Sequence, residues 1–259
     1  MARRTDRIEK IIDLLKVHNG ASIRELSETL NVSLMTVRRD LTDLANDSVV
    51  KLIFGGVILN PERVASDPAE EYLLQVEKEK HAEEKNRIGE KAASLVEPGD
   101  VIIVDSGTTS EALIRHLPND RPITVLCYSS NVLELILRKR NCTPIFAGGY
   151  FHENTMMFES PEGVELIKKN RANKAFIAAS GVSDKLGVTC AKAYETSTKS
   201  TAIKSSLKNI LMVDSSKFDA VKAAHFADLA NFDIVISDPG IPERYRNLLE
   251  ELKIALLVV

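Results

Sequence analysis

A short loop that is rich in hydroxyl groups stands out because it has the composition of an anion-binding turn. The loop, Ser106-Gly107-Thr108-Thr109-Ser110, follows the apolar run Val101–Val104 and Asp105, and it precedes an amphipathic helical pattern. A strand that turns directly into a helix aims free backbone N–H groups and the positive end of the helix dipole at the space above it. Phosphate or carboxylate is the natural ligand there. Plain N-capping would need only one hydroxyl group, so four around one glycine favour an anion site.

Polar residues also follow other predicted strands, and in open α/β sheets ligands gather at the carboxyl ends of the strands. Lys217 is either the counter-charge for a phosphate or an exposed loop lysine, and its position in the sequence leaves both open. Glu195 and Lys199 have i,i+4 spacing, which is more often that of a solvent-exposed helix pair than that of a site. The candidate ligand-binding residues are Asp105, Ser106, Gly107, Thr108, Thr109, Tyr128, Ser129, Asn131, Gly148, Gly149, Glu195 and Lys217.

A second group of residues has the pattern of a DNA-reading helix. Between Ser22 and Arg39, two helical patterns are joined by a tight turn at Asn31-Val32, and the second helix turns Val37, Leu41 and Leu44 to a core. Its opposite face presents hydroxyl and guanidinium groups, which read base edges or hold phosphates. A small helical subdomain with a basic surface is the alternative. The candidate DNA-contacting residues, which include the two helix caps, are Ser22, Ser33, Met35, Thr36, Arg38 and Arg39.

The two groups lie in different parts of the chain. Residues 1–57 hold three helical patterns and a β-ribbon, which predict a winged helix-turn-helix domain. Residues 60–91 are charge-dense and include the run Glu77-Lys78-Glu79-Lys80. They predict a solvated linker, assigned to residues 58–80, that is followed by an exposed helix rather than a dedicated partner site. Residues 81–259 alternate apolar runs with amphipathic stretches, which predicts an α/β domain with an open, mostly parallel sheet and helices on both faces. The expected strands are 101–104, 124–127, 143–147, 174–179, 209–213, 233–237 and 253–258, and the expected helices are 110–117, 132–138, 163–170, 197–207 and 243–252.

The composition is that of an ordinary globular protein, with 259 residues, 44% hydrophobic and 27% charged. The sequence contains no apolar run that could cross a bilayer and no signal peptide, so a cytoplasmic protein is expected. Three cysteines without a CxxC motif, scattered histidines and the lack of GxxxxGK and GxGxxG motifs predict no metal site and no cofactor. Cys127 is expected to be a core residue rather than a nucleophile. The net charge of −3 means that any DNA contact must rest on local clusters.

Together these motifs resemble the DeoR family of bacterial repressors over essentially the whole chain. The matching segments are Val32–Leu41, the wing end Gly55-Gly56, Asp105–Thr109, Gly148-Gly149 and Asp214–Phe218. The resemblance implies further DNA contacts from the wing, at Lys51, Gly55 and Gly56. It also implies that the sensor domain is similar to ribose-5-phosphate isomerase and the CoA transferases and binds phosphorylated sugars.

The chain departs from the family pattern at three places. Cys127-Tyr128-Ser129 stands where most members have Thr-Asn-Ser, Lys51 and Phe54 stand for Arg and His in the wing, and Asp47-Ser48 replaces a common Gly. The first departure resembles the branch of the family that regulates deoxyribonucleoside catabolism and responds to 2-deoxyribose 5-phosphate. A ring at Tyr128 is expected to fill the space that a 2-hydroxyl group would need.

The sequence therefore predicts a repressor of a sugar or deoxyribonucleoside catabolism operon, released from its operator by a phosphorylated sugar, with 2-deoxyribose 5-phosphate favoured. Its expected partners are duplex operator DNA, that sugar phosphate and further copies of the chain, in a dimer or a higher even-numbered homo-oligomer. No membrane contact and no catalytic residue is expected. Two alternatives stay open: a phosphosugar isomerase that moves protons with Asp105, Asp214 or Lys217, and an activator with the same effector class. A recognition helix favours a regulator because an isomerase does not need one.

Overall fold

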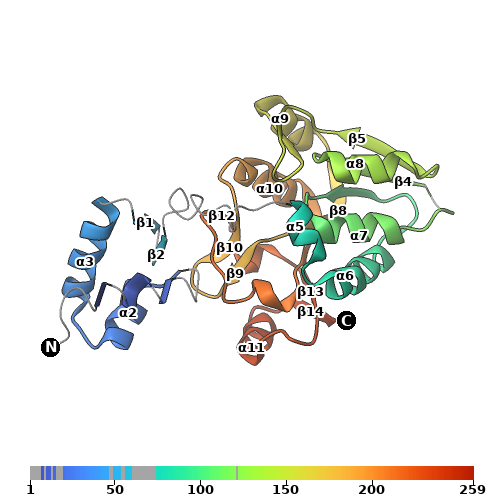
Figure 1. Ribbon diagram of the computed structural model, residues 1–259. Helices are drawn as coiled ribbons and strands as arrows, with labels where there is room; N and C mark the ends of the chain where they lie inside the picture. Colours follow the sequence, from blue (N-terminus) through green and yellow to red (C-terminus); the bar gives the residue numbers. More distant parts are fainter. Residues whose placement is uncertain are drawn as a thin grey trace.

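The computed structural model describes residues 7–259 except residues 9, 13, 16–19, 47–48, 54–55, 60–73 and 121. The predicted wing turn at Asp47-Ser48, the wing residues Phe54 and Gly55, and most of the predicted linker lie outside the described residues. Figure 1 shows a small N-terminal body that contains α2, α3, β1 and β2, and a larger body that contains the remaining elements.

The N-terminal body is the expected winged helix-turn-helix. Its first helix, described in part between residues 7 and 15, is followed by α2 (Ile23–Leu30), α3 (Leu34–Asn46) and the antiparallel strands β1 (Val50–Ile53) and β2 (Gly56–Leu59). Helix α2 begins with a capping box between Ser22 and Glu25 and ends at Asn31 in the left-handed conformation, which makes the tight turn into α3. The core of this body is formed by Ile11, Leu15, Leu26, Val37, Leu41, Leu44, Val50 and Val57.

A seven-stranded parallel sheet forms the centre of the larger body, in the order β14-β13-β11-β8-β3-β4-β5. All seven strands coincide with strands expected from the sequence. Because parallel strands are covered on both faces, each of these strands contains a short apolar run, which made them recognisable. The strands are β3 (Val101–Val104), β4 (Ile123–Cys127), β5 (Cys142–Phe146), β8 (Ala172–Ala178), β11 (Ser206–Met212), β13 (Ile234–Ser237) and β14 (Ala255–Val258).

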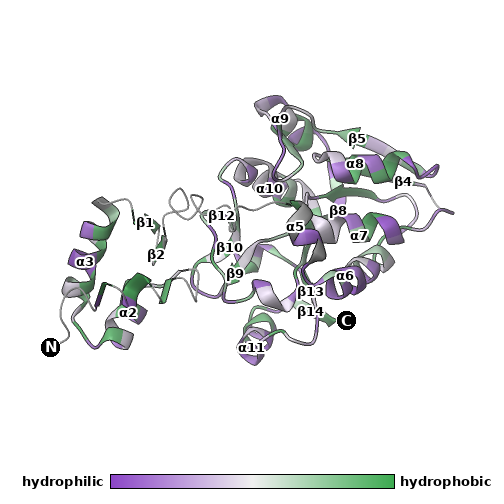
Figure 2. Ribbon diagram, in the orientation of Figure 1, coloured by the Kyte–Doolittle hydropathy of each residue, from purple (hydrophilic) through white to green (hydrophobic). Residues whose placement is uncertain are grey.

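Helices cover both faces of this sheet, as predicted. One face packs against a hydrophobic cluster from α6 (Ala82–Ser94), α7 (Thr108–His116) and α8 (Ser130–Leu137). The other face packs against a cluster that includes residues of α9 (Pro161–Lys169), α10 (Glu195–Lys204) and α11 (Glu243–Glu251). Figure 2 shows the amphipathic character behind this layering, with α6 and α11 largely purple on the outside and the central strands largely green.

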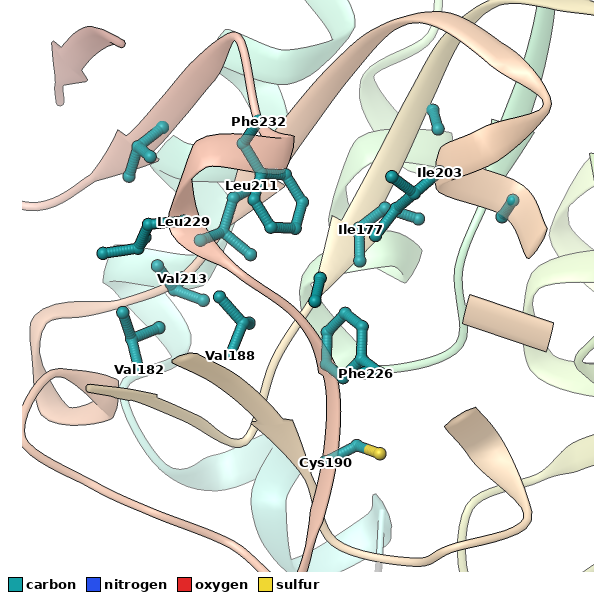
Figure 3. Packing of buried hydrophobic residues seen from close by; sticks show 14 of the residues in the cluster. Ile177, Val182, Val188, Cys190, Ile203, Leu211, Val213, Phe226, Leu229 and Phe232 are labelled. Atoms are coloured by element: carbon teal, nitrogen blue, oxygen red, sulfur yellow. The ribbon is translucent and has the colours of Figure 1, made fainter. Parts of the chain in front are cut away.

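Two small sheets and one short helix were not expected from the sequence. Strands β12 (Ala224–Ala227), β10 (Gly187–Cys190) and β9 (Gly181–Ser183) form an antiparallel sheet, and β6 (Tyr150–His152) pairs with β7 (Met157–Glu159). In Figure 3, Val182, Val188 and Phe226 of the first of these sheets lie near Leu211 and Val213 of the large sheet, within one buried cluster. The short helix is α5 (Leu74–Glu79), within the segment predicted to be a solvated linker.

The turn between β9 and β10 contacts the N-terminal body. Lys185 in this turn forms an ion pair with Glu25 of α2. A Cβ atom built on Gly56 would meet the carbonyl oxygen of Ala21 at 2.8 Å and a methyl carbon of Leu186 at 3.2 Å. Only glycine therefore fits at Gly56, where the wing meets this turn of the larger body.

Candidate functional site: the carboxyl edge of the sheet

A fully buried carboxylate, Asp105, lies directly after β3 and organises the centre of the edge. Its Oδ1 accepts hydrogen bonds from the hydroxyl of Tyr128 (2.7 Å) and the backbone N–H of Ser106 (2.8 Å). Its Oδ2 accepts from the backbone N–H of Ala178 (2.9 Å) and from Nζ of Lys199 (2.5 Å). Burial, together with the charge of Asp105, raises the pKa of Tyr128, so the phenol stays protonated as the donor. Asp105 and Tyr128 are thus hydrogen-bonded to each other, and Asp105 is also hydrogen-bonded to Ser106, Ala178 and Lys199.

The pair Glu195–Lys199 is buried, which corrects the sequence interpretation of a solvent-exposed helix pair. The Lys199 ammonium lies 3.6 Å from Oε2 of Glu195, and both side chains are at most 6% exposed. Burial raises the pKa of Glu195, an effect that the charge of Lys199 opposes and that of Asp105 reinforces. Two carboxylates thus share one ammonium. The i,i+4 spacing carries no information about burial, because it is the same on either face of a helix.

The N-terminus of α7 has the geometry expected of an anion-binding turn. Gly107 precedes the helix with φ at +115°, a conformation that side chains rarely adopt, and no side chain caps the helix. Ser106 and Thr109 are buried, whereas Thr108 is half-buried. Ser110 uses its hydroxyl internally by donating to the carbonyl of Ser106 (3.3 Å). The backbone N–H groups of the first turn have no acceptors within the helix, which leaves donors for a ligand.

Two buried polar atoms near this turn have no hydrogen-bond partner among the described residues. They are Oγ of Ser129, which follows β4, and Oδ1 of Asn131 in the first turn of α8. The amide of Asn131 also donates to Oε1 of Glu111 in α7 (3.0 Å), so α7 and α8 meet at this point. A buried polar atom without a partner is unfavourable unless a ligand or water satisfies it. These two atoms therefore favour a polar ligand at this edge.

Three lysines surround α5 at the side of the edge next to β11. Nζ of Lys217 lies 3.2 Å from Oε2 of Glu77, and Nζ of Lys80 lies 2.9 Å from Oε1 of Glu77. Lys85 is only 5% exposed and donates to the backbone carbonyl of Glu77 (2.5 Å). Burial and the charge of Lys217 lower the pKa of Lys85, whereas Asp214 and Glu77 oppose that change. Lys217 is thus partly buried and already paired, an arrangement that neither sequence interpretation anticipated.

Gly148 and Gly149 follow β5, the neighbour of β4 in the sheet, and the N–H of Ala147 just before them donates to the carbonyl of Cys127 (2.9 Å). Gly149 has φ at +146°, and a Cβ there would lie 2.3 Å from the carbonyl oxygen of Glu159, so this position requires glycine. Both glycines line a surface cavity of about 510 Å³, together with Tyr150, Ser160, Glu162, Gly163 and Leu166. The close contact with β7 explains why residue 149 is a glycine, so a bound ligand is not needed to explain it.

The candidate DNA-contacting residues of α3 share one outer face. Met35 is 71% exposed, and Arg38 and Arg39 are exposed. Ser33 is exposed and caps the helix by accepting from the N–H of Thr36 (3.1 Å).

The other candidates of this body divide into accessible and buried positions. Ser22 is occupied by the capping box of α2, and Lys51 of β1 is exposed. Gly56 is buried beside Leu186, which does not suit a direct DNA contact in this conformation, and Gly55 lies outside the described residues.

Metal and thiol chemistry find no support in the described part of the chain. No group of three or more His, Cys, Asp or Glu residues there is arranged to hold a metal ion. Burial raises the pKa of Cys127 to about 12, so its thiol is an unreactive core group, in line with the sequence prediction. None of the helices that the structure describes is long and apolar enough to span a membrane.

Four charged residues of this edge were missed or undervalued by the sequence interpretation: Glu77, Lys85, Glu111 and Lys199. Glu111 is buried and accepts from Asn131, Lys78 (2.9 Å) and Arg115 (3.2 Å), so it connects α5, α7 and α8. In the sequence these residues belong to charge runs or helical pairs, which are typical of solvated surfaces. Only their tertiary placement shows that they are buried.

Comparison with known proteins gives matches to both parts of the chain. The model for the DeoR-like helix-turn-helix domain matches residues 7–63, and that for the DeoR C terminal sensor domain matches residues 80–239. The deoxyribose operon repressor of Escherichia coli (strain K12) is 34% identical over 98% of each chain, and the HTH-type transcriptional regulator IolR of Bacillus subtilis (strain 168) is 26% identical over 96% of this chain and 97% of that protein. Among solved structures, ribose 5-phosphate isomerase A from Methanocaldococcus jannaschii has a TM-score of 0.38 and 18% identity, over 52% of this chain and 53% of that chain.

Proposed function

We propose that this chain, which belongs to the DeoR family of transcriptional regulators, represses a sugar or deoxyribonucleoside catabolism operon and leaves its operator when it binds a phosphorylated sugar. The observation that carries the proposal is the combination of an exposed polar face on α3 with unpartnered polar atoms and clustered lysines at the sensor edge. A DNA-binding regulator of this kind acts in the cytoplasm.

Operator DNA is the proposed partner of α3. Thr36, Arg38 and Arg39 are in reach of base edges and phosphates if α3 enters the major groove. Replacing an arginine that reads guanine should weaken operator binding by about 1–3 kcal/mol and relax specificity at one position. An arginine that holds only phosphate should lower affinity evenly and reduce the salt dependence. Fluorescence anisotropy on operator duplexes measures both effects for Arg38→Ala and Arg39→Ala.

Arg24→Ala is the matched control for these variants. Arg24 is another exposed arginine of the same body, but it lies on α2 and pairs with Glu28 at 2.9 Å. Unchanged operator affinity in both Arg38→Ala and Arg39→Ala would refute the assignment of α3 as the recognition helix.

The effector is proposed to place its phosphate at the start of α7, with Lys85 and Lys217 as counter-charges. The helix N-terminus and the two ammonium groups both favour a dianion. The sugar hydroxyls would then satisfy Ser129 and Asn131, whose buried oxygens lack partners. The favoured effector is 2-deoxyribose 5-phosphate, because a relative that is 34% identical over 98% of this chain is named a deoxyribose operon repressor.

A ligand panel tests the choice of effector. Thermal shift and operator release should be measured with 2-deoxyribose 5-phosphate, ribose 5-phosphate and fructose 6-phosphate. A ligand that binds only the folded protein at about 100 times its dissociation constant adds about 2.7 kcal/mol of stability. The largest shift is expected for 2-deoxyribose 5-phosphate. Equal shifts, or a largest shift with the hexose phosphate, would reject this effector while leaving the family assignment intact.

A purely regulatory role also predicts that the bound sugar phosphate is returned unchanged. Asp105, the most buried candidate base, already accepts hydrogen bonds from Tyr128 and Lys199 and has little capacity left to take a substrate proton. Product analysis after prolonged incubation should recover each sugar phosphate without isomerisation or cleavage. An isomerised product would replace the regulator proposal with an enzymatic one.

Light scattering with and without operator tests the proposed even-numbered homo-oligomer.

A further inference from the structure

Helix α5 carries an internal anion into the lysine cluster of the sensor edge. Glu77 is the only carboxylate of α5 whose side chain the structure describes, and its two oxygens face Lys217 and Lys80 at 3.2 Å and 2.9 Å. The Glu77 side chain is 17% exposed, and that of Lys217 is 19% exposed. This contact is therefore a largely buried ion pair between residues 140 positions apart, rather than a fluctuating surface pair.

The cluster has more positive than negative charge to balance. Lys85 donates to a neutral carbonyl of Glu77, which uses one of the three protons of its ammonium group. Asp214 attracts Lys85, but its Oδ1 already accepts from the N–H and the hydroxyl of Ser216. Three ammonium groups thus face two carboxylates, those of Glu77 and Asp214, so the cluster keeps a net positive charge that an anionic ligand would balance.

Contacts at both ends of α5 hold Glu77 in this position. The N–H of Leu74 donates to the carbonyl of Asn154 in the β6–β7 turn (2.9 Å), and the Leu74 side chain is buried. Lys78 pairs with Glu111 of α7 at 2.9 Å. Helix α5 therefore spans the edge between the hairpin and α7, and it is the first described element after strand β2 of the wing.

We propose that Glu77 is a built-in competitor of the effector phosphate. The phosphate displaces the Glu77 carboxylate from Lys217 and the Glu77 backbone carbonyl from Lys85, and thereby releases α5. This inference rests on the proposed binding of a phosphorylated sugar at this edge. One site thus holds either the carboxylate of the chain itself or the phosphate of the effector. Release of α5 loosens the element that connects the sensor domain to the wing, which links effector binding to operator release.

Competition predicts that neutralising Glu77 strengthens anion binding, the opposite of the usual effect of altering a residue in a binding site. Glu77→Gln keeps the shape of the side chain and removes its charge. Its dissociation constants for inorganic phosphate and for 2-deoxyribose 5-phosphate, measured by titration calorimetry, should be about three- to tenfold lower than those of the unaltered protein. Glu83→Gln is the control, because Glu83 is an exposed carboxylate at the start of α6 and this variant has the same net charge as Glu77→Gln.

The calorimetry separates this inference from the proposed function. Tighter binding in Glu77→Gln but not in Glu83→Gln supports competition, and so does binding that is detectable only in Glu77→Gln. Equal binding in all three proteins overturns the competition and leaves the effector proposal standing. Absence of binding in all three overturns both.

Hydrogen exchange of the unaltered protein gives a second readout that does not depend on a variant. Peptides covering residues 74–79 should exchange faster when 2-deoxyribose 5-phosphate is bound, because α5 is released. Peptides from α7 should exchange more slowly, because the phosphate covers its N-terminus. Slower exchange of both segments would show that α5 closes over the effector, which would overturn the displacement.

Discussion

Two buried lysines at the same sheet edge, Lys199 and Lys85, have opposite charge balances around them. Lys199 lies between Asp105 and Glu195 at 2.5 Å and 3.6 Å, and these carboxylates raise its pKa despite burial. Lys85 donates to a backbone carbonyl beside Lys217 and Lys80, and burial lowers its pKa. The first cluster has an excess of negative charge and the second an excess of positive charge.

The difference indicates which cluster can receive an anionic ligand. An anion that approached Lys199 would meet two carboxylates and one ammonium group. An anion that approached Lys85 would meet three ammonium groups, the displaceable carboxylate of Glu77 and the carboxylate of Asp214. A buried charge that is fully paired stabilises the arrangement around it, but an incompletely paired one favours a ligand that completes the pairing. We therefore infer that the Asp105–Lys199 cluster positions the loop before α7 and that the Lys85 cluster binds phosphate.

The largest effect is expected from Lys199→Met. This change leaves Asp105 and Glu195 buried without a counter-charge, and removing one partner of a buried ion pair destabilises by about 3–5 kcal/mol. Urea unfolding measures the loss. Combining it with Glu195→Gln should recover part of the stability, since one uncompensated carboxylate is removed. If the single variant is as stable as the unaltered protein, the charge in this cluster has no structural role.

Lys85→Met should have the opposite profile, with little change in stability and a large loss of effector binding. The substitution removes a buried ammonium that the protein alone does not fully pair, so the free energy of unfolding should change by less than about 1 kcal/mol. A charge-assisted hydrogen bond contributes about 1.5–3 kcal/mol, so affinity for the sugar phosphate should fall up to about 100-fold. Operator binding without effector is the internal control. A stability loss as large as that of Lys199→Met, with unchanged effector affinity, would reverse the roles of the two lysines.

Thr108→Val tests whether the ligand also reaches α7. The substitution keeps the shape of a half-buried side chain and removes its hydroxyl donor. Loss of one hydrogen bond at the lower end of the charge-assisted range should weaken effector binding about tenfold. The variant should still bind operator and release it only at higher effector concentration. Loss of operator binding in a folded variant would instead indicate a structural role for this loop.

The sequence was informative where chemistry and structure are local. The loop Ser106–Thr109 was recognisable because the strand, glycine, hydroxyl groups and helix are contiguous. The seven parallel strands were recognisable because each contains a short apolar run. Strands β6, β7, β9, β10 and β12 were missed because three or four residues are too few to show an alternating pattern. Their pairing depends on contacts with the large sheet.

The lysine cluster was out of reach for the opposite reason, because its members come from distant segments. Glu77 lies in a run of alternating charges, and Lys85 follows soon after in another charged stretch, both of which are typical of solvated surfaces. The fold lays α5 across the sheet edge and brings Glu77 to Lys217, 140 residues away. No pattern in the sequence indicates that α5 packs across the sheet edge. The open role of Lys217 beside the predicted site was only a partial indication.

The smallest expected effect is the pH dependence of the Glu77 ion pairs. Despite burial, the charges of Lys217 and Lys80 lower the pKa of Glu77 to about 2 from its ordinary value of 4.5. Because the pKa is lower in the folded than in the unfolded protein, Glu77 stabilises the fold fully above about pH 4.5, and this contribution declines as the pH falls towards 2. Lys80 is well exposed, and solvent screening limits the contribution to less than about 1 kcal/mol.

Unaltered protein and Glu77→Gln should therefore differ most in free energy of unfolding between pH 5 and 7. The difference should shrink below about pH 4.5 and vanish only as the pH approaches 2. Denaturant titrations at several pH values measure this difference, and added salt should shrink it because the pair with Lys80 is partly exposed. Glu83→Gln, which removes a carboxylate in water, should show no such convergence. A difference that persists unchanged at pH 3.5 would mean that Glu77 stabilises α5 by packing rather than by charge. In that case Glu77 could not compete with a phosphate, and the contrast between the Lys85 and Lys199 clusters would lose its displaceable carboxylate.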